Sequence, residues 1–281
     1  MGSIYLQAGP AQVKPLSTSL FARLPTSAND AGSHGAIMMI MTLISACCFA
    51  GPQVCPSGII IKRPKVLMST PVFCYEQFVA NFDASPIAPW ASVSPWELTR
   101  QSEYIVRELL ATLPATAYRI SNEVAVHVTA TVEQGAVLKG PLIMGPECFV
   151  ATGAYLRGGN WVAQRCTFGP GAELKSSFVF AGTKLAHFNF VGDSILGEDV
   201  NLEAGSIICN YRNERTDKEI RVRLGAALHP TGCQKFGALV GDHSRIGANA
   251  VLAPGGLLKA GTVVRRASLR DDEVASTEEI D

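Results

Sequence analysis

The chain has 281 residues, of which 47% are hydrophobic, so it is long and apolar enough to bury a core. Lysine plus arginine equals aspartate plus glutamate at 24 each, which argues against a partner such as nucleic acid or an anionic membrane. The eight cysteines show no C-x-x-C pair and no regular framework, which argues against a zinc ribbon or a disulfide-stapled secreted domain. We therefore expect a globular protein of a reducing, cytoplasmic compartment.

Residues 1–70 are expected to lie outside the fold, because they are rich in Ala, Ser, Pro and Gly and show no sustained period. Their apolar run, Ala36–Ala50, is shorter than the roughly 20 residues that span a bilayer. The run resembles the apolar part of an export signal, but the nearest preceding Lys or Arg is Arg23, so the usual basic flank is missing. We prefer a disordered leader, or a reading frame that truly starts at Met68.

Residues 71–121 are predicted to form a helical N-terminal cap. Ser94-Pro95-Trp96-Glu97 combines an N-cap serine with proline and glutamate at favoured first-turn positions, and Pro114 ends the pattern. Between these signals, apolar residues recur on one helical face: Leu98, Ile105, Val106, Leu109, Leu110 and Leu113. The sequence thus predicts a helix over 95–113, and another short helix within Phe73–Trp90.

Residues 122–269 carry a period of six. The repeating apolar positions are Val126, Val132, Leu138, Met144, Val150, Leu156, Val162, Phe168, Leu174 and Phe180. Six residues make one short strand and a turn, and three such units close a coil that stacks on the next by parallel hydrogen bonding at roughly 4.8 Å. The period slips near Ala186, resumes at Phe190, breaks after Cys209 and returns at Val240. We expect about six coils, with the helix of 95–113 over the first.

The break after Cys209 holds a charged insertion, residues 211–237, which must loop out of the coils, and residues 270–281 form a charged C-terminal tail. Residues eighteen apart lie one coil above another, which stacks Lys139, Arg157 and Lys175. At about 5 Å and an effective dielectric near 20, each adjacent pair costs on the order of 3 kcal/mol before solvent and salt relax it. The column therefore predicts an anionic ligand; the alternative is a solvated basic face neutralised by carboxylates such as Glu173.

The hexads resemble the left-handed parallel β-helix of hexapeptide-repeat acyltransferases. Ala186-His187, followed by Val191-Gly192-Asp193, resembles the catalytic stretch of the sugar-nucleotide acyltransferases of this fold. Further motifs follow the acetyltransferase half of bacterial N-acetylglucosamine-1-phosphate uridyltransferase in order: Tyr155-Leu156-Arg157, Glu173-Leu174-Lys175, Asp199-Val200-Asn201 and Cys209-Asn210-Tyr211. The insertion and its closing stretch, Thr231–Gly237, are similar to C-terminal domains of archaeal-type glucose-1-phosphate nucleotidyltransferases.

The resemblance implies an all-β fold and an acyltransferase. The enzyme would move an acetyl or longer acyl group from acetyl-CoA, another acyl-CoA or an acyl carrier protein to an amine or hydroxyl of a phosphorylated or nucleotide sugar. It implies no metal and no permanently bound cofactor. It also implies a homotrimer with sites between neighbouring subunits, toward which the insertion would reach.

The same resemblance assigns roles to individual residues. His187 would be the general base, which suits imidazole because its pKa ordinarily lies near neutral pH. Arg157 and Lys175 would hold the sugar phosphate. The residues that would line the sugar or acyl-CoA site are Asn201, Asn210 and Tyr211. About one coil beyond His187, the backbone N–H groups of Ala204 and Gly205 are candidates for stabilising the oxyanion formed from the acyl-CoA.

Two departures accompany this interpretation: Phe190, and the insertion with its closing stretch, which looks more like the archaeal-type domains. Phe190 stands where the family has a tyrosine, so one hydroxyl contact is lost, and nothing before residue 122 offers the glycine-rich start of a nucleotidyltransferase domain. Three alternatives stay open. A non-catalytic sugar-nucleotide-binding or assembly module would share the fold. A zinc hydratase is disfavoured because the five histidines include no close pair. Finally, His187 itself is open to a purely structural reading.

Overall fold

The computed structural model describes residues 73–274 of the chain. The predicted leader and the last part of the tail, residues 275–281, lie outside the described residues. Within residues 73–274, no helix has both the length and the apolar character needed to cross a membrane.

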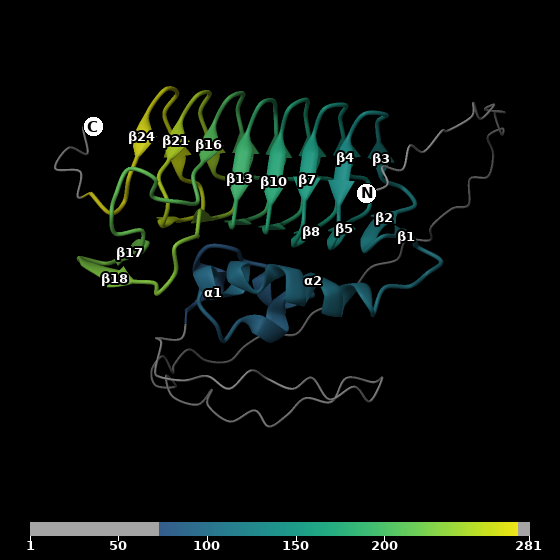
Figure 1. Ribbon diagram of the computed structural model, residues 1–281, viewed down its shortest axis with the longest axis horizontal. Helices are drawn as coiled ribbons and strands as arrows, with labels where there is room; N and C mark the ends of the chain where they lie inside the picture. The colour runs from purple at the N-terminus through teal and green to yellow at the C-terminus, as the bar shows by residue number, and fades with distance from the viewer. Residues whose placement is uncertain (1–72, 275–281) are drawn as a thin grey trace, which may run out of the picture. The chain divides into compact units, whose positions relative to one another are not determined.

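Short strands stack into three large sheets (Figure 1). The first sheet contains β1 Tyr118–Ser121, β2 Val124–His127, β5 Leu142–Met144, β8 Asn160–Val162, β11 Phe178–Val179, β14 Ile195–Leu196, β19 Ala238–Val240 and β22 Gly256–Leu258. The second contains β3 Thr131–Val132, β6 Phe149–Val150, β9 Thr167–Phe168, β12 Lys184–Leu185, β15 Asn201–Leu202, β20 Arg245–Ile246 and β23 Val263–Val264. The third contains β4 Val137–Lys139, β7 Tyr155–Arg157, β10 Glu173–Lys175, β13 Phe190–Gly192, β16 Ile207–Ile208, β21 Val251–Leu252 and β24 Leu269–Arg270.

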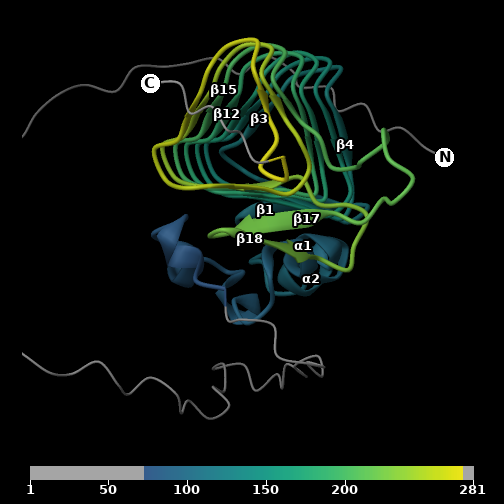
Figure 2. The ribbon, with the colours of Figure 1, turned by 90° about the vertical axis from the view of Figure 1, so that its left-hand side faces the viewer.

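The chain visits the three sheets in turn, and neighbouring coils pair in parallel, except that β1 pairs antiparallel with β2. Figure 2 looks at the coils from the end that carries β24. Each coil runs clockwise from the first sheet to the second and third while advancing toward the viewer, which is the left-handed sense. The predicted left-handed parallel β-helix is therefore confirmed. The second and third sheets hold 7 strands each, slightly more than the expected six coils.

The inward apolar positions fill the interior of the coils, but the period slips earlier than predicted. Val179, five residues after Leu174, points inward instead of Phe180. Phe180 points outward and meets Trp161 edge-on, with ring centroids 5.4 Å apart. Val191 likewise occupies the interior instead of Phe190. The period of six fails here because the corners at residues 176–177 and 193–194 are each one residue shorter than the other corners of the coils.

The residues before the β-helix pack along the outer face of the first sheet. They form three 3₁₀ turns and two α-helices: η1 Tyr75–Gln77, η2 Phe82–Ala84, η3 Ala88–Trp90, α1 Pro95–Arg100 and α2 Ser102–Leu110. The single helix predicted over 95–113 is thus two, separated at Gln101, and the side chain of Ser94 makes no capping hydrogen bond.

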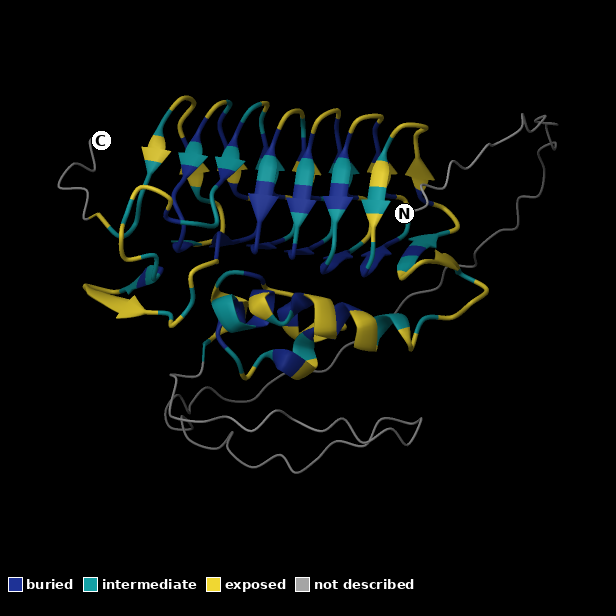
Figure 3. Ribbon diagram, in the orientation of Figure 1, coloured by how far each residue is buried: buried dark blue, intermediate teal, exposed yellow. Residues whose placement is uncertain are grey.

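This helical segment lies beside the coils rather than over the end of the first coil, as Figures 1 and 2 show. The reason is the outward face of the first sheet, which is itself apolar: Ala125, Ile143, Trp161, Phe178, Ile195 and Leu239. Leu98, Ile105 and Val106 of the helices are fully buried against this cluster. Accordingly, strands such as β8 are buried on both faces (Figure 3).

The insertion of residues 211–237 leaves the coils and forms an antiparallel hairpin, β17 Arg221–Leu224 with β18 Ala227–Pro230. It then folds back, so that Ile220, Val222 and Phe236 are fully buried in the same outer apolar cluster. Its Arg212 is ion-paired with Asp271 and Glu273, which belong to the predicted tail. The insertion is therefore docked on its own chain, and part of the tail holds it there.

Candidate functional site

His187 is exposed at the corner between β12 and β13, where the second sheet gives way to the third. Its carbonyl accepts a hydrogen bond from the N–H of Gly205 at 2.8 Å, so Ala204 and Gly205 lie on the same corner one coil further on, as predicted. This bond also corrects a detail. The N–H of Gly205 is already engaged, which leaves the N–H of Ala204 as the candidate oxyanion donor.

The predicted column of cations exists in the third sheet. Lys139 is in register with Arg157, and Arg157 with Lys175, on adjacent strands β4, β7 and β10. Arg157 Nε donates to Glu173 Oε1 at 2.8 Å, and Lys175 Nζ lies 3.0 Å from both carboxylate oxygens of Asp193. The repulsion within the column is therefore offset by carboxylates of the chain itself, as the alternative interpretation anticipated for Glu173.

Asp193 connects two of the predicted residues at the corner between the third and first sheets. Its side chain is only 8% exposed, and it accepts hydrogen bonds from Lys175 Nζ and from Asn210 Nδ2. Its backbone carbonyl accepts from the N–H of Gly237 at 2.9 Å, which anchors the end of the insertion. The sequence analysis assigned no role to Asp193. Its position at one of the two shortened corners was the signal that could have found it.

The predicted site residues thus fall into separate groups within one chain. His187 and Ala204 lie at one edge of the third sheet, the corner at which its strands begin. Lys175 and Asn210 lie at the other edge, where its strands end. The two edges are separated by a strand of three residues, about 10 Å at 3.3 Å per residue. Asn201 belongs to the second sheet, where it pairs in register with Lys184 and Arg245. Tyr211 is the first residue of the insertion, and Lys218 Nζ lies 5.3 Å from its ring centroid.

Phe190 lies between the two groups on the outer face of the third sheet, in register with Glu173 and Ile207. Gly192, two residues later, leaves room for the ring, because a Cβ atom there would lie 2.9 Å from Phe190 Cζ and 2.6 Å from Asn210 Nδ2. An apolar ring therefore occupies the surface that joins the base to the cations. In the part of the chain from residue 73 to 274, no three His, Cys, Asp or Glu side chains gather to hold a metal ion.

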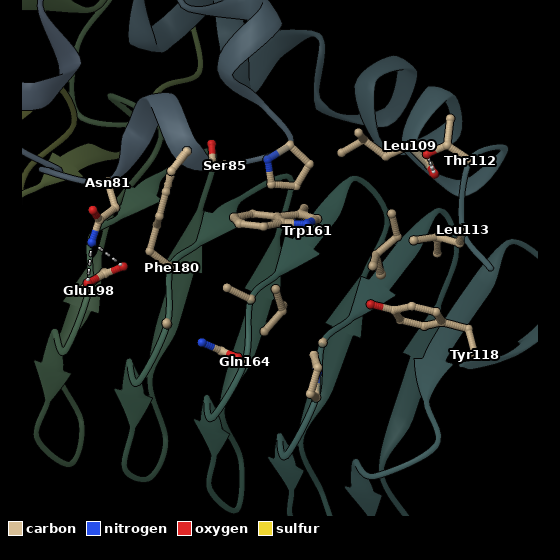
Figure 4. A pocket seen from close by; sticks show the side chains of 18 residues that line it. Asn81, Ser85, Leu109, Thr112, Leu113, Tyr118, Trp161, Gln164, Phe180 and Glu198 are labelled. Carbon is tan, nitrogen blue, oxygen red and sulfur yellow. Dashed lines mark hydrogen bonds between the residues drawn. The ribbon is translucent and has the colours of Figure 1, made fainter. Parts of the chain in front are cut away.

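A groove of about 460 Å³ lies elsewhere, between the helical segment and the first sheet (Figure 4). Trp161, Phe180 and Tyr118 contribute its aromatic surface, and Asn81 donates to Glu198 at one end at 3.2 Å. It contains none of the predicted site residues. The sequence analysis missed it because the groove arises only where segments distant in sequence dock on each other.

Comparison with known proteins gives a consistent set of relatives, although no family model matches the chain. A bifunctional sugar-1-phosphate nucleotidylyltransferase/acetyltransferase of Sulfurisphaera tokodaii is 32% identical over 147 residues, which cover 52% of this chain and 36% of that protein. The bifunctional protein GlmU of Methanococcus vannielii is 25% identical over 186 residues, covering 64% and 44%. The chain therefore spans less than half the length of these relatives. Their names confirm the resemblance drawn from the motifs.

Solved structures align at lower sequence identity. The acetyltransferase domain of PglB from Neisseria gonorrhoeae, in complex with acetyl coenzyme A, aligns with a TM-score of 0.33 at 12% identity over 65% of this chain and 71% of that one. A hexapeptide transferase family protein from Anaplasma phagocytophilum aligns with a TM-score of 0.26 at 20% identity, covering 52% and 72%.

Proposed function

We propose that the chain is an acyltransferase that moves an acetyl or longer acyl group from a thioester donor to an amine or hydroxyl of a phosphorylated or nucleotide sugar. The donor is acetyl-CoA, another acyl-CoA or an acyl carrier protein. The observation that carries the proposal is an exposed imidazole, His187, placed beside the backbone corner at Ala204 within a chain whose relatives are named acetyltransferases.

In the proposed reaction, the nitrogen or oxygen of the acceptor attacks the thioester carbonyl, and His187 removes the acceptor's proton as the new bond forms. The carbonyl oxygen gains negative charge, which the N–H of Ala204 stabilises. When the tetrahedral intermediate collapses, the carbon–sulfur bond breaks and the proton passes from the imidazolium to the leaving thiolate. Charge and protons balance without a bound metal or a permanent cofactor.

The acceptor's phosphate is proposed to lie over the third sheet, held by Arg157 with Lys175 beside it. Asn201, Asn210 and Tyr211 would line the sugar or acyl-CoA site. Because the base and the cations occupy opposite edges of one sheet, we propose that a second copy of the chain completes each site, in a cytoplasmic homotrimer. The exposed tip of the insertion, residues 225–230, would reach a neighbour, whereas Ile220, Val222 and Phe236 hold the insertion on its own chain.

A non-catalytic module that binds or assembles around sugar nucleotides is the second candidate. The observation that favours it is the pairing of both proposed phosphate ligands, Arg157 and Lys175, with carboxylates of the same chain. Such a module would bind the sugar ligand without consuming the thioester.

The proposed function is tested by incubating the purified chain with acetyl-CoA and a panel of amino sugar phosphates and nucleotide amino sugars, and by following thiol release. We expect acceptor-dependent release of free thiol and an acylated sugar detected by mass spectrometry. Binding of a sugar phosphate without acyl transfer, from acetyl-CoA and from longer acyl-CoAs and acyl carrier protein alike, would support the non-catalytic module instead.

A further inference from the structure

The three cations stacked on the third sheet are not equivalent, because they differ in how completely their charge is neutralised. Lys175 is the most fully neutralised. Its side chain is 21% exposed, that of Asp193 is 8% exposed, and the ammonium faces both carboxylate oxygens at 3.0 Å. A pair this sheltered resists separation, because breaking it would leave an uncompensated charge away from water.

Arg157 is paired more loosely. Its contact with Glu173 uses Nε, and the two side chains are 40% and 32% exposed. Within residues 73–274, the two terminal nitrogens of its guanidinium make no hydrogen bond to another side chain. An exposed pair of this kind exchanges easily, and a guanidinium fork binds a phosphate in two places at once.

Lys139 is the least neutralised of the three. Its side chain is exposed, and no carboxylate of the described range lies within ion-pairing distance. Its ammonium lies over the ring of Tyr155, 5.0 Å from the centroid, which holds the cation in place without cancelling its charge.

We infer that the net positive charge offered to an anionic ligand comes from Lys139 and Arg157, which are in register on neighbouring strands, while Lys175 contributes at most an N–H donor. Lys139 is thereby a further binding residue, one coil before the pair that the family resemblance implies. Strands β4 and β7 are neighbours, so the two cations stand about 4.8 Å apart at their roots, and one phosphate group can contact both. The ligand is a phosphate ester; its identity as a sugar phosphate or nucleotide sugar rests on the proposed function.

Isothermal titration with two probes, glucosamine 1-phosphate and UDP-N-acetylglucosamine, tests the inference and distinguishes a terminal phosphate from a diphosphate. The variants are Lys139→Gln, Lys139→Arg, and the double variant Lys175→Gln with Asp193→Asn, which removes a pair without changing net charge. Lys184, an exposed lysine of the second sheet, supplies the matched control Lys184→Gln. Circular dichroism and the melting temperature verify the fold of each variant.

For the tighter-binding probe, we expect Lys139→Gln to raise Kd about tenfold at 50 mM salt and by less at 200 mM, since screening weakens charge attraction. The Kd of Lys139→Arg and that of the control Lys184→Gln should both stay within threefold of the Kd of the unaltered chain. The double variant should cost less than Lys139→Gln. The inference is overturned if the double variant costs more, if Lys184→Gln costs as much, or if neither probe binds the unaltered chain. No acyl donor is present, so failure of acyl transfer alone leaves this result standing.

Discussion

At the residue scale, Asp193 is the side chain that links two of the predicted site residues to the insertion. It joins Lys175 and Asn210 through its carboxylate and the end of the insertion through its backbone carbonyl. A carboxylate that is 8% exposed and fully paired is difficult to replace, because its removal strands the ammonium of Lys175. Asp193 thus links Lys175 and Asn210, two of the proposed binding residues, to the stability of the corner that carries them.

We predict that Asp193→Ala lowers the free energy of unfolding by about 3 kcal/mol, because a largely buried ion pair loses one partner. Urea denaturation followed by circular dichroism measures this loss. Asp199→Ala is the control, because Asp199 is 60% exposed and its only ion-pair contact in the described chain is with His243 at 3.6 Å. Equal unfolding midpoints for the two variants would show that the ion pair of Asp193 does not stabilise the fold.

At the element scale, the insertion is held by charges of the segment that follows the last strand. Arg212, whose side chain is 2% exposed, contacts both carboxylate oxygens of Asp271, at 2.6 and 2.7 Å, and donates to the carbonyl of Pro254 at 3.1 Å. Glu273 receives Arg215 and Arg221 from the same insertion. Because Asn210 and Tyr211 directly precede Arg212, this network also fixes where they lie.

We predict that Asp271→Ala lowers the free energy of unfolding by about 3 kcal/mol and increases amide exchange in residues 211–224, because Arg212 is left buried without its bidentate partner. Glu214→Gln is the control, since Glu214 is 60% exposed and lies 3.4 Å from the same guanidinium. Unchanged exchange in the alanine variant would mean that the Arg212–Asp271 pair does not hold the insertion.

The same pair predicts a pH dependence. Burial raises the pKa of Asp271, but its hydrogen bonds and ion pair with Arg212 outweigh burial and hold the pKa below its ordinary value. A lowered pKa in the folded state stabilises the fold above the unfolded value, about 3.9, and this contribution fades as pH falls through the folded value. Between pH 6 and 3, the destabilisation caused by Asp271→Asn should therefore shrink. A constant difference across that range would contradict the assignment.

The coils could be predicted from the sequence because their inward positions are apolar and recur every six residues. This pattern is visible in the linear sequence without knowledge of which segments pack together. It misplaced Phe180 and Phe190 because two corners are one residue shorter, which turns Phe180 into the outer cluster and Phe190 onto the outer face of the third sheet. The register of Lys139, Arg157 and Lys175 followed from spacing alone. Of their carboxylate partners, Glu173 was named, whereas Asp193, eighteen residues after Lys175, was not, because spacing gives the register but not which side chains turn toward one another.

At the scale of the whole described chain, residues 73–274 have two apolar interiors that share the strands of the first sheet. One fills the coils, and the other lies between that sheet and the helical segment, where Trp161 and Phe178 point. The sequence predicted the helical residues but not this second interior. It depends on the docking of segments that are far apart in the chain, which no local pattern encodes.

We predict that Ile105→Ala lowers the free energy of unfolding by about 2–5 kcal/mol, because Ile105 of α2 is fully buried in the second interior and its truncation leaves a cavity. A single urea transition, seen both by far-ultraviolet circular dichroism and by tryptophan fluorescence, should shift as one. Tyr104→Ala is the neighbouring control, since Tyr104 is 48% exposed. If the two signals separate, the helical segment unfolds independently of the coils.

The central claim, that His187 is the base of an acyl transfer, is tested most directly by comparing the rates of His187→Ala and His243→Ala with acetyl-CoA and the best acceptor of the panel. His243 is a matched control, because it is another exposed corner histidine, on the edge between the first and second sheets. We predict that His187→Ala lowers kcat by about 10²- to 10⁴-fold with little change in KM, whereas His243→Ala stays within twofold. A His187→Ala variant that keeps its kcat would contradict the account.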